Sequence, residues 1–218
     1  MTKHRAIQLG VLAFSFCAAA SVRAQGKFEV SPIAGYETSG SYPVSLNSNG
    51  SVSNPIDQLR VNDALAYGTF LDYNFTENFQ AEFMWDHNNT SYSARQVSDG
   101  TYFKAYDSKI DQFQFGGNYT FLDSSHRFRP YFAASVGFTH DSNSGGNSNR
   151  TEFSYSLGGG VKYYLSRHFG LRGDARYLPT YGSSSYGVYC YPFGPCYNAK
   201  VANFLHRGNF VGGLIFNF

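Results

Sequence analysis

Apolar and polar residues alternate in eight stretches of this chain, and this alternation limits its possible folds more than any other feature. Side chains two positions apart lie on one face of a β-strand, so each stretch predicts a strand with one apolar face. Each is about as long as a tilted strand that crosses a bilayer, ~9–11 residues. Pro32 lacks a ladder N–H and predicts a bulge in the first strand. The expected strands are 28–38, 65–75, 79–87, 113–121, 131–139, 153–165, 169–177 and 210–218.

The apolar faces of these strands carry no Asp, Glu, Lys or Arg, whereas the opposite faces carry six acidic and four basic residues. In a membrane barrel the apolar face contacts lipid and the polar face lines the lumen. The alternative, a soluble lipocalin-type barrel, would bury these charges in an apolar core at high cost. We therefore expect a membrane barrel with these charges inside: Glu29, Glu37, Asp72, Glu82, Asp86, Lys162, Arg172, Asp174, Arg176 and Arg207.

Short and long connections alternate between the expected strands. The short ones are 76–78, 122–130 and 166–168; the long ones are 39–64, 88–112, 140–152 and 178–209. Outer-membrane barrels show this pattern, with short periplasmic turns and longer extracellular loops, so both termini are expected in the periplasm. The long segments are rich in Ser, Asn, Gly and Tyr, a composition that suits either a contact surface for a surface ligand or ordinary solvated loops.

The first residues have the features of an export signal. Lys3, His4 and Arg5 precede an apolar run over 6–20, which is too short for a spanning helix of about 20 residues. Small residues at positions 22 and 24 predict cleavage between Ala24 and Gln25. We therefore expect two segments: a removed signal, residues 1–24, and a single barrel domain, residues 25–218.

Charge and cysteine usage narrow the function further. Three of the 17 basic residues, Lys3, Arg5 and Arg23, lie in the expected signal, which leaves 14 against 15 acidic residues and gives no reason to expect a nucleic-acid partner. Cys190 and Cys196 remain after cleavage and enclose a five-residue segment with two Pro and one Gly. A disulfide at a hairpin tip is expected, because disulfides persist in exported proteins.

The carboxyl-terminal stretch places Phe210, Gly213, Phe216 and Phe218 in a strand pattern that ends on an aromatic ring. Such a ring fits the aromatic girdle of a membrane barrel. The stretch resembles the terminal signal of bacterial outer-membrane β-barrels, although Val211 stands where that family prefers a polar residue. The resemblance implies insertion into outer-membrane lipid by the barrel assembly machinery.

The chain as a whole resembles the eight-stranded barrels of the OmpA and OmpX type, most clearly at 129–131, 158–163 and 171–177. The resemblance implies an all-β, up-and-down antiparallel transmembrane barrel in the bacterial outer membrane, monomeric, with a structural or cell-surface interaction role. The chain stops at the barrel, so the tethering role of a peptidoglycan-binding domain is not expected.

Two other functions remain open on the sequence. The inward charges form either an internal plug or the gate of a narrow channel for ions or small solutes. A lipid A-modifying enzyme is the third possibility, but His126 is followed by Arg127 and Phe128 rather than by the His-x-Ser pattern of the deacylase group. No nucleophile elbow, His-Glu-x-x-His or phosphate loop is present, so no catalytic residue, cofactor or metal ligand is predicted.

Overall fold

The computed structural model describes residues 27–46, 56–143, 149–182, 187–190, 196–201 and 204–218. These residues form strands and connections, and none of them lies in a helix that could cross a membrane. The strands are β1 Phe28–Ser39, β2 Ser41–Leu46, β3 Ile56–Val61, β4 Ala64–Asn74, β5 Phe79–Gln96, β6 Tyr102–Thr120, β7 Phe128–Asn143, β8 Arg150–Tyr164, β9 Phe169–Tyr177, β10 Thr180–Tyr181, β11 Gly187–Cys190, β12 Cys196–Val201, β13 Phe204–Leu205 and β14 Arg207–Asn217.

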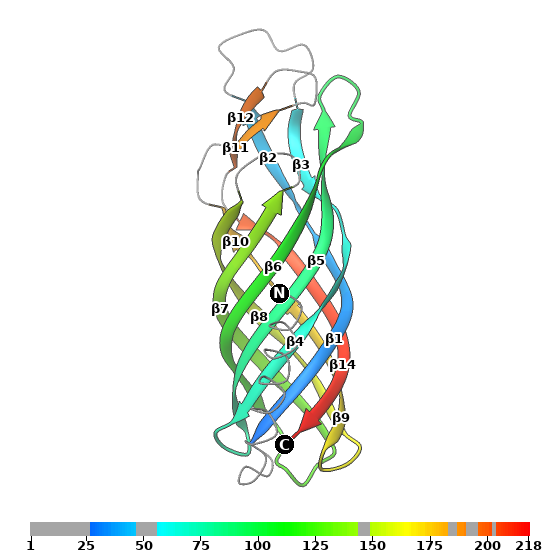
Figure 1. The fold of residues 1–218 in the computed structure, drawn as a ribbon, viewed down its shortest axis with the longest axis vertical. Coiled ribbons are helices and arrows are strands. Elements are labelled where there is room, and N and C mark those ends of the chain that lie inside the picture. The colour runs from blue at the N-terminus through cyan, green and yellow to red at the C-terminus, as the bar shows by residue number, and fades with distance from the viewer. Residues whose placement is uncertain (1–26, 47–55, 144–148, 183–186, 191–195, 202–203) are drawn as a thin grey trace, which may run out of the picture.

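Eight of these strands close into an antiparallel barrel in the order β1, β4, β5, β6, β7, β8, β9 and β14 (Figure 1). The barrel closes where β14 pairs with β1, from Glu29 opposite Asn217 to Ser39 opposite Arg207. The ends of the chain complete this seam, because Lys27 N–H donates to the Phe218 carbonyl at 3.0 Å. The expected fold, an eight-stranded up-and-down antiparallel barrel, is confirmed.

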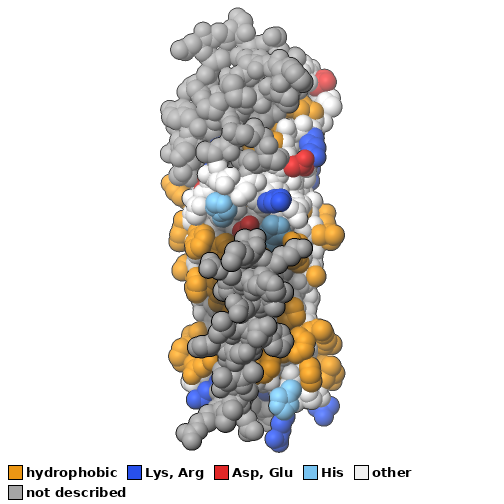
Figure 2. All heavy atoms as spheres, in the orientation of Figure 1, with side chains coloured by type: hydrophobic (Ala, Val, Ile, Leu, Met, Phe, Trp, Pro, Cys, Tyr) orange, Lys and Arg blue, Asp and Glu red, His pale blue; other side chains and the backbone are white. Residues whose placement is uncertain are grey.

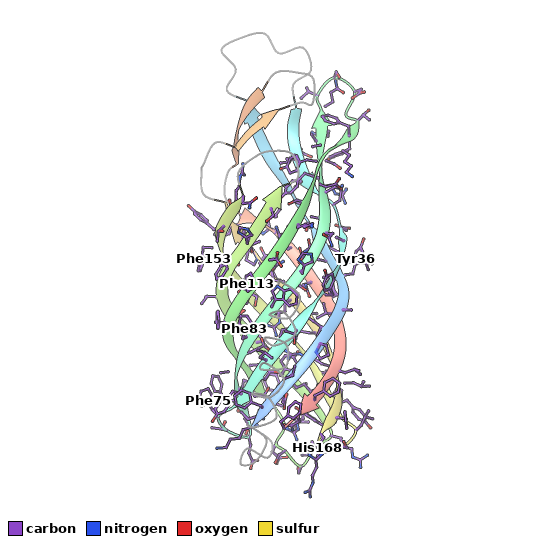
Figure 3. The ribbon with its side chains drawn as sticks, in the orientation of Figure 1. Tyr36, Phe75, Phe83, Phe113, Phe153 and His168 are labelled. Atoms are coloured by element: carbon purple, nitrogen blue, oxygen red, sulfur yellow. The ribbon has the colours of Figure 1, made fainter. Side chains whose placement is uncertain are left out.

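The outer wall exposes large apolar side chains in a broad band (Figure 2), with Phe75 near one end of it and Phe153 toward the other (Figure 3). Phe75 is 63% exposed at the end with the short turns, and Phe153 is 54% exposed toward the other end. Between them, Val136 and Leu157 are also exposed. Burial in lipid, rather than in a protein core, is the arrangement that makes such a wall favourable. The strands thus turn their apolar faces outward, as the charge pattern predicts.

All four segments expected to be long loops contain strand residues, which corrects the sequence-based boundaries. In segment 140–152, β7 continues to Asn143 and β8 begins at Arg150. Segment 88–112 is mostly a hairpin, because β5 continues to Gln96 and β6 begins at Tyr102. Segment 39–64 contains β2 and β3, and segment 178–209 contains β10 to β13. Above the membrane both faces of a strand can be polar, so the apolar alternation that marks a lipid-facing strand disappears. The strands continue because their backbones still pair.

The bulge expected at Pro32 is absent. The register between β1 and β14 is the same on both sides of this residue, since Val30 lies opposite Phe216 and Ile33 lies opposite Gly213. Pairing with β4 is also continuous, with Pro32 opposite Thr69. The missing N–H therefore interrupts the ladder toward β14 without shifting it.

Candidate functional site

The barrel interior is the candidate site, because ten charged side chains of the wall are buried there. They fall into two groups separated by apolar residues. The lower charged layer, nearer the short turns, consists of Glu29, Asp72, Glu82, Lys162, Arg172, Asp174 and Arg176. The upper polar layer consists of Glu37, Asp86, Asn88, Gln112, Arg207 and Asn209. The structure thus places all ten predicted interior charges inside the barrel.

Lys162 is the first centre of the lower charged layer. Its ammonium lies 2.7 Å from Glu29 Oε2 and 3.0 Å from Asp72 Oδ2. It also donates to Gln80 Oε1 at 2.6 Å. Three acceptors therefore use the three protons of the ammonium group, which accounts for its complete burial.

Arg172 and Arg176 are the other two centres. Arg172 lies 2.9 Å from Asp72 and 2.5 Å from Glu82, and its guanidinium stacks 3.6 Å from the centroid of the Phe70 ring. Arg176 lies 2.6 Å from Glu82 and 2.7 Å from Asp174. The Tyr131 hydroxyl donates to Asp174 and accepts from Arg172 Nε at 2.9 Å. Each of the four carboxylates in this layer therefore contacts at least one cation at 3.0 Å or less.

The upper polar layer is paired more loosely. Arg207 lies 3.5 Å from Glu37, which also accepts from Gln112 Nε2 at 2.7 Å. Asp86 accepts only a 3.3 Å bond from Asn209 Nδ2, and it forms no ion pair with a basic side chain of the described part of the chain. This layer therefore holds two carboxylates and one guanidinium, bridged mainly by side-chain amides.

Apolar side chains also face inward, in addition to the polar and charged side chains that the sequence predicts there. Ile33, Phe70, Met84, Leu178 and Val211 form a buried cluster. Val61, Tyr92, Ile110 and Leu205 form a second cluster. The sequence could have indicated this, because Phe70 and Met84 each lie two positions from an inward charge, Asp72 and Glu82, and so on the same face of their strands. The first cluster also explains why Val211 departs from the expected terminal motif, since its side chain packs inside the barrel.

Comparison with known proteins agrees with this architecture. Residues 9–199 match the model of the outer membrane protein beta-barrel domain. The chain belongs to this family. The outer-membrane barrel therefore has the architecture of small OmpA- and OmpX-like barrels, and family membership implies a location in the bacterial outer membrane.

Three solved structures of the same architecture are similar to the outer-membrane barrel. The outer membrane protein OprG from Pseudomonas aeruginosa has a TM-score of 0.57 at 14% identity, covering 91% of this chain and 99% of that one. Neisserial surface protein A has a TM-score of 0.52 at 17% identity, and the match covers 88% of this chain and 97% of that one. Outer membrane protein AlkL in lipid bilayers has a TM-score of 0.56 at 15% identity, and the match covers 89% of this chain and 92% of that one. No curated protein sequence shows significant similarity to the chain.

The residues of the predicted insertion signal lie on the closing strand of the outer-membrane barrel. Phe210 and Phe218 are exposed, at 55% and 56%, and Phe216 is partly exposed. A Cβ on Gly213 would lie 2.2 Å from the carbonyl oxygen of Pro32, so β14 requires glycine there to approach β1. The signal-peptidase site at Ala24 and Gln25 lies outside the described residues and stays a prediction.

For the cysteines, the structure gives the backbone alone. β11 and β12 form an antiparallel hairpin in which Cys190 is paired with Cys196. The positions of the two sulfur atoms are outside the described part of the structure. The disulfide therefore stays a prediction, although the backbone register is compatible with it.

A Ser, a His and an Asp meet in the turn between β6 and β7, which the sequence did not single out as a site. Ser125 Oγ lies 3.1 Å and Asp123 Oδ1 2.9 Å from the same atom, Nδ1 of His126. The hydrogen bonds from Ser125 and His126 lower the pKa of the exposed Asp123 carboxyl to about 2. A catalytic triad needs the two ring nitrogens to contact different partners. This group therefore stabilises the turn and lacks the geometry of a proton relay.

Proposed function

We propose that this protein is a non-conducting, non-enzymatic outer-membrane barrel that acts at the cell surface through the end of the barrel with the long connections. The observation that carries the proposal is the filled interior. Ion pairs, amides and two apolar clusters occupy the cross-section at successive levels. An eight-stranded barrel is only wide enough for side chains to fill.

The apolar clusters argue against the alternative, a narrow channel. An ion that passed the lower charged layer would meet the cluster of Phe70, Met84 and Leu178, which offers no polar ligand. Moving an ion out of water into such surroundings is very costly. The close ion pairs of the lower charged layer also argue against a channel, because a passing ion would have to separate them.

The opposite end offers a surface for contacts. β5 and β6 extend past the barrel as a hairpin, and β3, β2, β12 and β11 follow as neighbours in an extended sheet (Figure 1). The hairpin turns at Gly100, whose φ is +70°, a conformation that favours glycine. Val97 and Tyr102 are exposed near this tip, at 53% and 43%. A projecting, paired hairpin with apolar groups near its tip suits recognition of a surface ligand.

Planar-bilayer conductance tests the closed state. The protein should show no steady current at neutral pH, with unheated gel mobility as the check that it is folded. A variant that removes a central pair, Glu82→Ser with Arg172→Ser, should stay closed if it still folds, because the apolar cluster of Phe70, Met84 and Leu178 still blocks the lumen. A steady current through the unmodified protein would contradict the proposal and favour a channel.

Cysteine labelling on intact cells tests the orientation. Asp99→Cys, at the tip of the β5–β6 hairpin, should react with a membrane-impermeant maleimide. Ser125→Cys, in the turn between β6 and β7, should react only after the outer membrane is permeabilised. Reaction of both variants with the same efficiency on intact cells would contradict an outward-facing hairpin and periplasmic termini.

Biogenesis and assembly follow from the closing strand. We propose that the barrel assembly machinery inserts the chain as a monomer and recognises the segment from Gly213 to Phe218. Deletion of Phe218 should reduce the amount in the outer membrane, because it removes an exposed girdle ring and the backbone contact that Phe218 N–H makes with the Phe28 carbonyl at 2.8 Å. Unchanged levels would contradict this role.

A further inference from the structure

At the end with the short turns, the lumen ends in a hollow that the proposed function does not use. Its volume is about 1010 Å³, at the upper limit of the range for ligand pockets, ~300–1,000 Å³. Glu29 of the lower charged layer also lines it, so the hollow adjoins that layer. All three short turns and the end of β14 contribute to this short-turn hollow, through residues 74–77, 124–127, 129, 164–168 and 217–218.

Basic side chains outnumber acidic ones in the short-turn hollow. The charged residues that line it are Arg127, Arg129, Arg167, Glu29 and Glu77. Glu29 is buried and already compensated, because it lies 2.7 Å from the ammonium group of Lys162. Asp123, an acid at the same end, contacts His126 Nδ1 at 2.9 Å and lies outside the lining. Three guanidinium groups therefore share the hollow with one exposed carboxylate, and Figure 2 shows Lys, Arg and His side chains at this end.

The three guanidinium groups differ in their contacts. Arg129 donates to two carbonyl oxygens of the β6–β7 turn at 3.0 Å each, so its role is to hold that turn. The side chains of Arg127 and Arg167 are exposed and form no hydrogen bond or ion pair with the described residues. Glu77 accepts a 3.4 Å hydrogen bond from Ser124 Oγ. The short-turn hollow therefore presents two uncommitted guanidinium groups.

Backbone hydrogen bonds hold these two arginines on adjacent segments. The Arg127 carbonyl accepts from the Tyr164 N–H at 2.8 Å, which ties the start of β7 to the end of β8. The Leu165 N–H donates to the Phe169 carbonyl at 3.0 Å and closes the turn that carries Arg167. Both guanidinium groups therefore extend from neighbouring, anchored backbones that line the same hollow.

The neutral part of the lining can bond a peptide backbone. Its hydroxyl and amide side chains are Asn74, Thr76, Ser124, Ser125, Ser166 and Asn217. Asn217 Oδ1 is buried and accepts no hydrogen bond from the described residues. The Asn217 N–H donates to the His168 carbonyl at 2.9 Å, which places this residue beside the turn of Arg167. A buried acceptor without a donor is costly, so the hollow favours a ligand that can donate hydrogen bonds.

We propose that the short-turn hollow binds an acidic, extended segment of a partner protein. Arg127 and Arg167 pair with its carboxylates, because a planar guanidinium matches a carboxylate with two parallel hydrogen bonds. Hydroxyl and amide side chains bond its backbone, and one backbone N–H donates to Asn217 Oδ1. Phosphate oxygens are acceptors, so a peptide satisfies this lining better than a phosphate. In the orientation proposed above, the partner is a periplasmic protein.

Fluorescence anisotropy with the intact protein in neutral detergent micelles tests the proposal. The probe is a short labelled peptide in which Glu and Ser alternate, and the control probe has Gln in place of Glu. Arg167→Gln should weaken binding of the Glu probe about threefold, and Arg127→Gln with Arg167→Gln about tenfold, as expected for exposed ion pairs. At about 1 M salt these differences should vanish, because exposed charges are then screened.

Lys27→Gln is the matched control variant. Lys27 is exposed at the same end and lies outside the lining, and its backbone contact with Phe218 does not involve its side chain. Binding of the Glu probe to this variant should equal binding to the unmodified protein. Unheated gel mobility checks that each variant is folded.

Several results would overturn the proposal. One is equal binding of the Glu and Gln probes, or failure of the Glu probe to bind. Another is a loss in Lys27→Gln as large as that in Arg167→Gln, which would show a general charge effect. Displacement of the Glu probe by an equal concentration of inorganic phosphate would show a phosphate site instead. This assay does not depend on orientation, so its result is separable from conductance and from the labelling of intact cells.

Discussion

The lower charged layer and the upper polar layer occupy the same lumen and are held together differently. In the lower charged layer, every carboxylate contacts a cation at 3.0 Å or less, and Asp72 and Glu82 each contact two. In the upper polar layer, the ion pair of Glu37 and Arg207 is 3.5 Å long, and Asp86 depends on an amide. The same barrel radius therefore holds one tight ionic network and one loose amide network.

This difference shows that the barrel accommodates buried charges by pairing them. The pairing is closer in the lower charged layer than in the upper polar layer. Breaking a buried pair leaves an uncompensated charge, which costs more than the intact pair contributes. The lower charged layer should therefore be the less tolerant of substitution. The upper polar layer, with fewer ionic contacts to lose, should tolerate isosteric neutral replacements.

The largest expected effect follows loss of a shared cation. Arg172→Met removes the partner that Asp72 and Glu82 have in common and should destabilise the folded barrel by about 3–5 kcal/mol. The measurement is the urea midpoint of unfolding in lipid vesicles, followed by unheated gel mobility. A loss below about 1 kcal/mol would show that the lower charged layer is no more critical than an exposed ion pair.

An unpaired charge on the lipid-facing wall extends the comparison, because it has no acidic partner at all. Leu157→Arg places a cation in the middle of the lipid-facing wall, where no acid lies, and should cost roughly 2–4 kcal/mol by the same measurement. Leu165→Arg is the matched control at the membrane boundary and should cost about 0–1 kcal/mol. Equal losses would contradict the assignment of the lipid-facing wall.

A pair of isosteric substitutions compares the two layers directly. Asp72→Asn replaces the carboxylate that pairs with Lys162 and Arg172 by a neutral amide. It should lower the free energy of unfolding by about 1–3 kcal/mol. Asp86→Asn should stay within about 0.5 kcal/mol of the unmodified protein, since it loses no ion pair to a described residue. If the Asp86 variant is the more destabilised one, the ranking of the layers is wrong.

The smallest effect is expected outside the barrel wall. Mass spectrometry after alkylation should find Cys190 and Cys196 joined by a disulfide. Its reduction should change the free energy of unfolding by no more than about 0.5 kcal/mol, because β11 and β12 lie outside the eight strands of the barrel wall, and such regions can open without global unfolding. Alkylation of both cysteines without reductant would contradict the bridge.

Particular residues show where sequence reasoning reached its limit. The strand from Phe79 onward was recognisable to His87, where one face is apolar, but not to Gln96, because above the membrane neither face faces lipid. The interior position of Glu82 followed from parity alone. Its contact with both Arg172 and Arg176 did not, since these residues lie on β9, which is not a neighbour of β5 in the barrel.

The sequence by itself determined the number of barrel strands, the face each turns to lipid and the set of charged residues inside. It could do so because strand periodicity is local and because lipid excludes unpaired charge from one face. The tertiary structure alone decided which acid meets which base and where apolar clusters interrupt the lumen. These depend on the stagger of strands around the closed barrel, a property of the whole sheet that no single stretch contains.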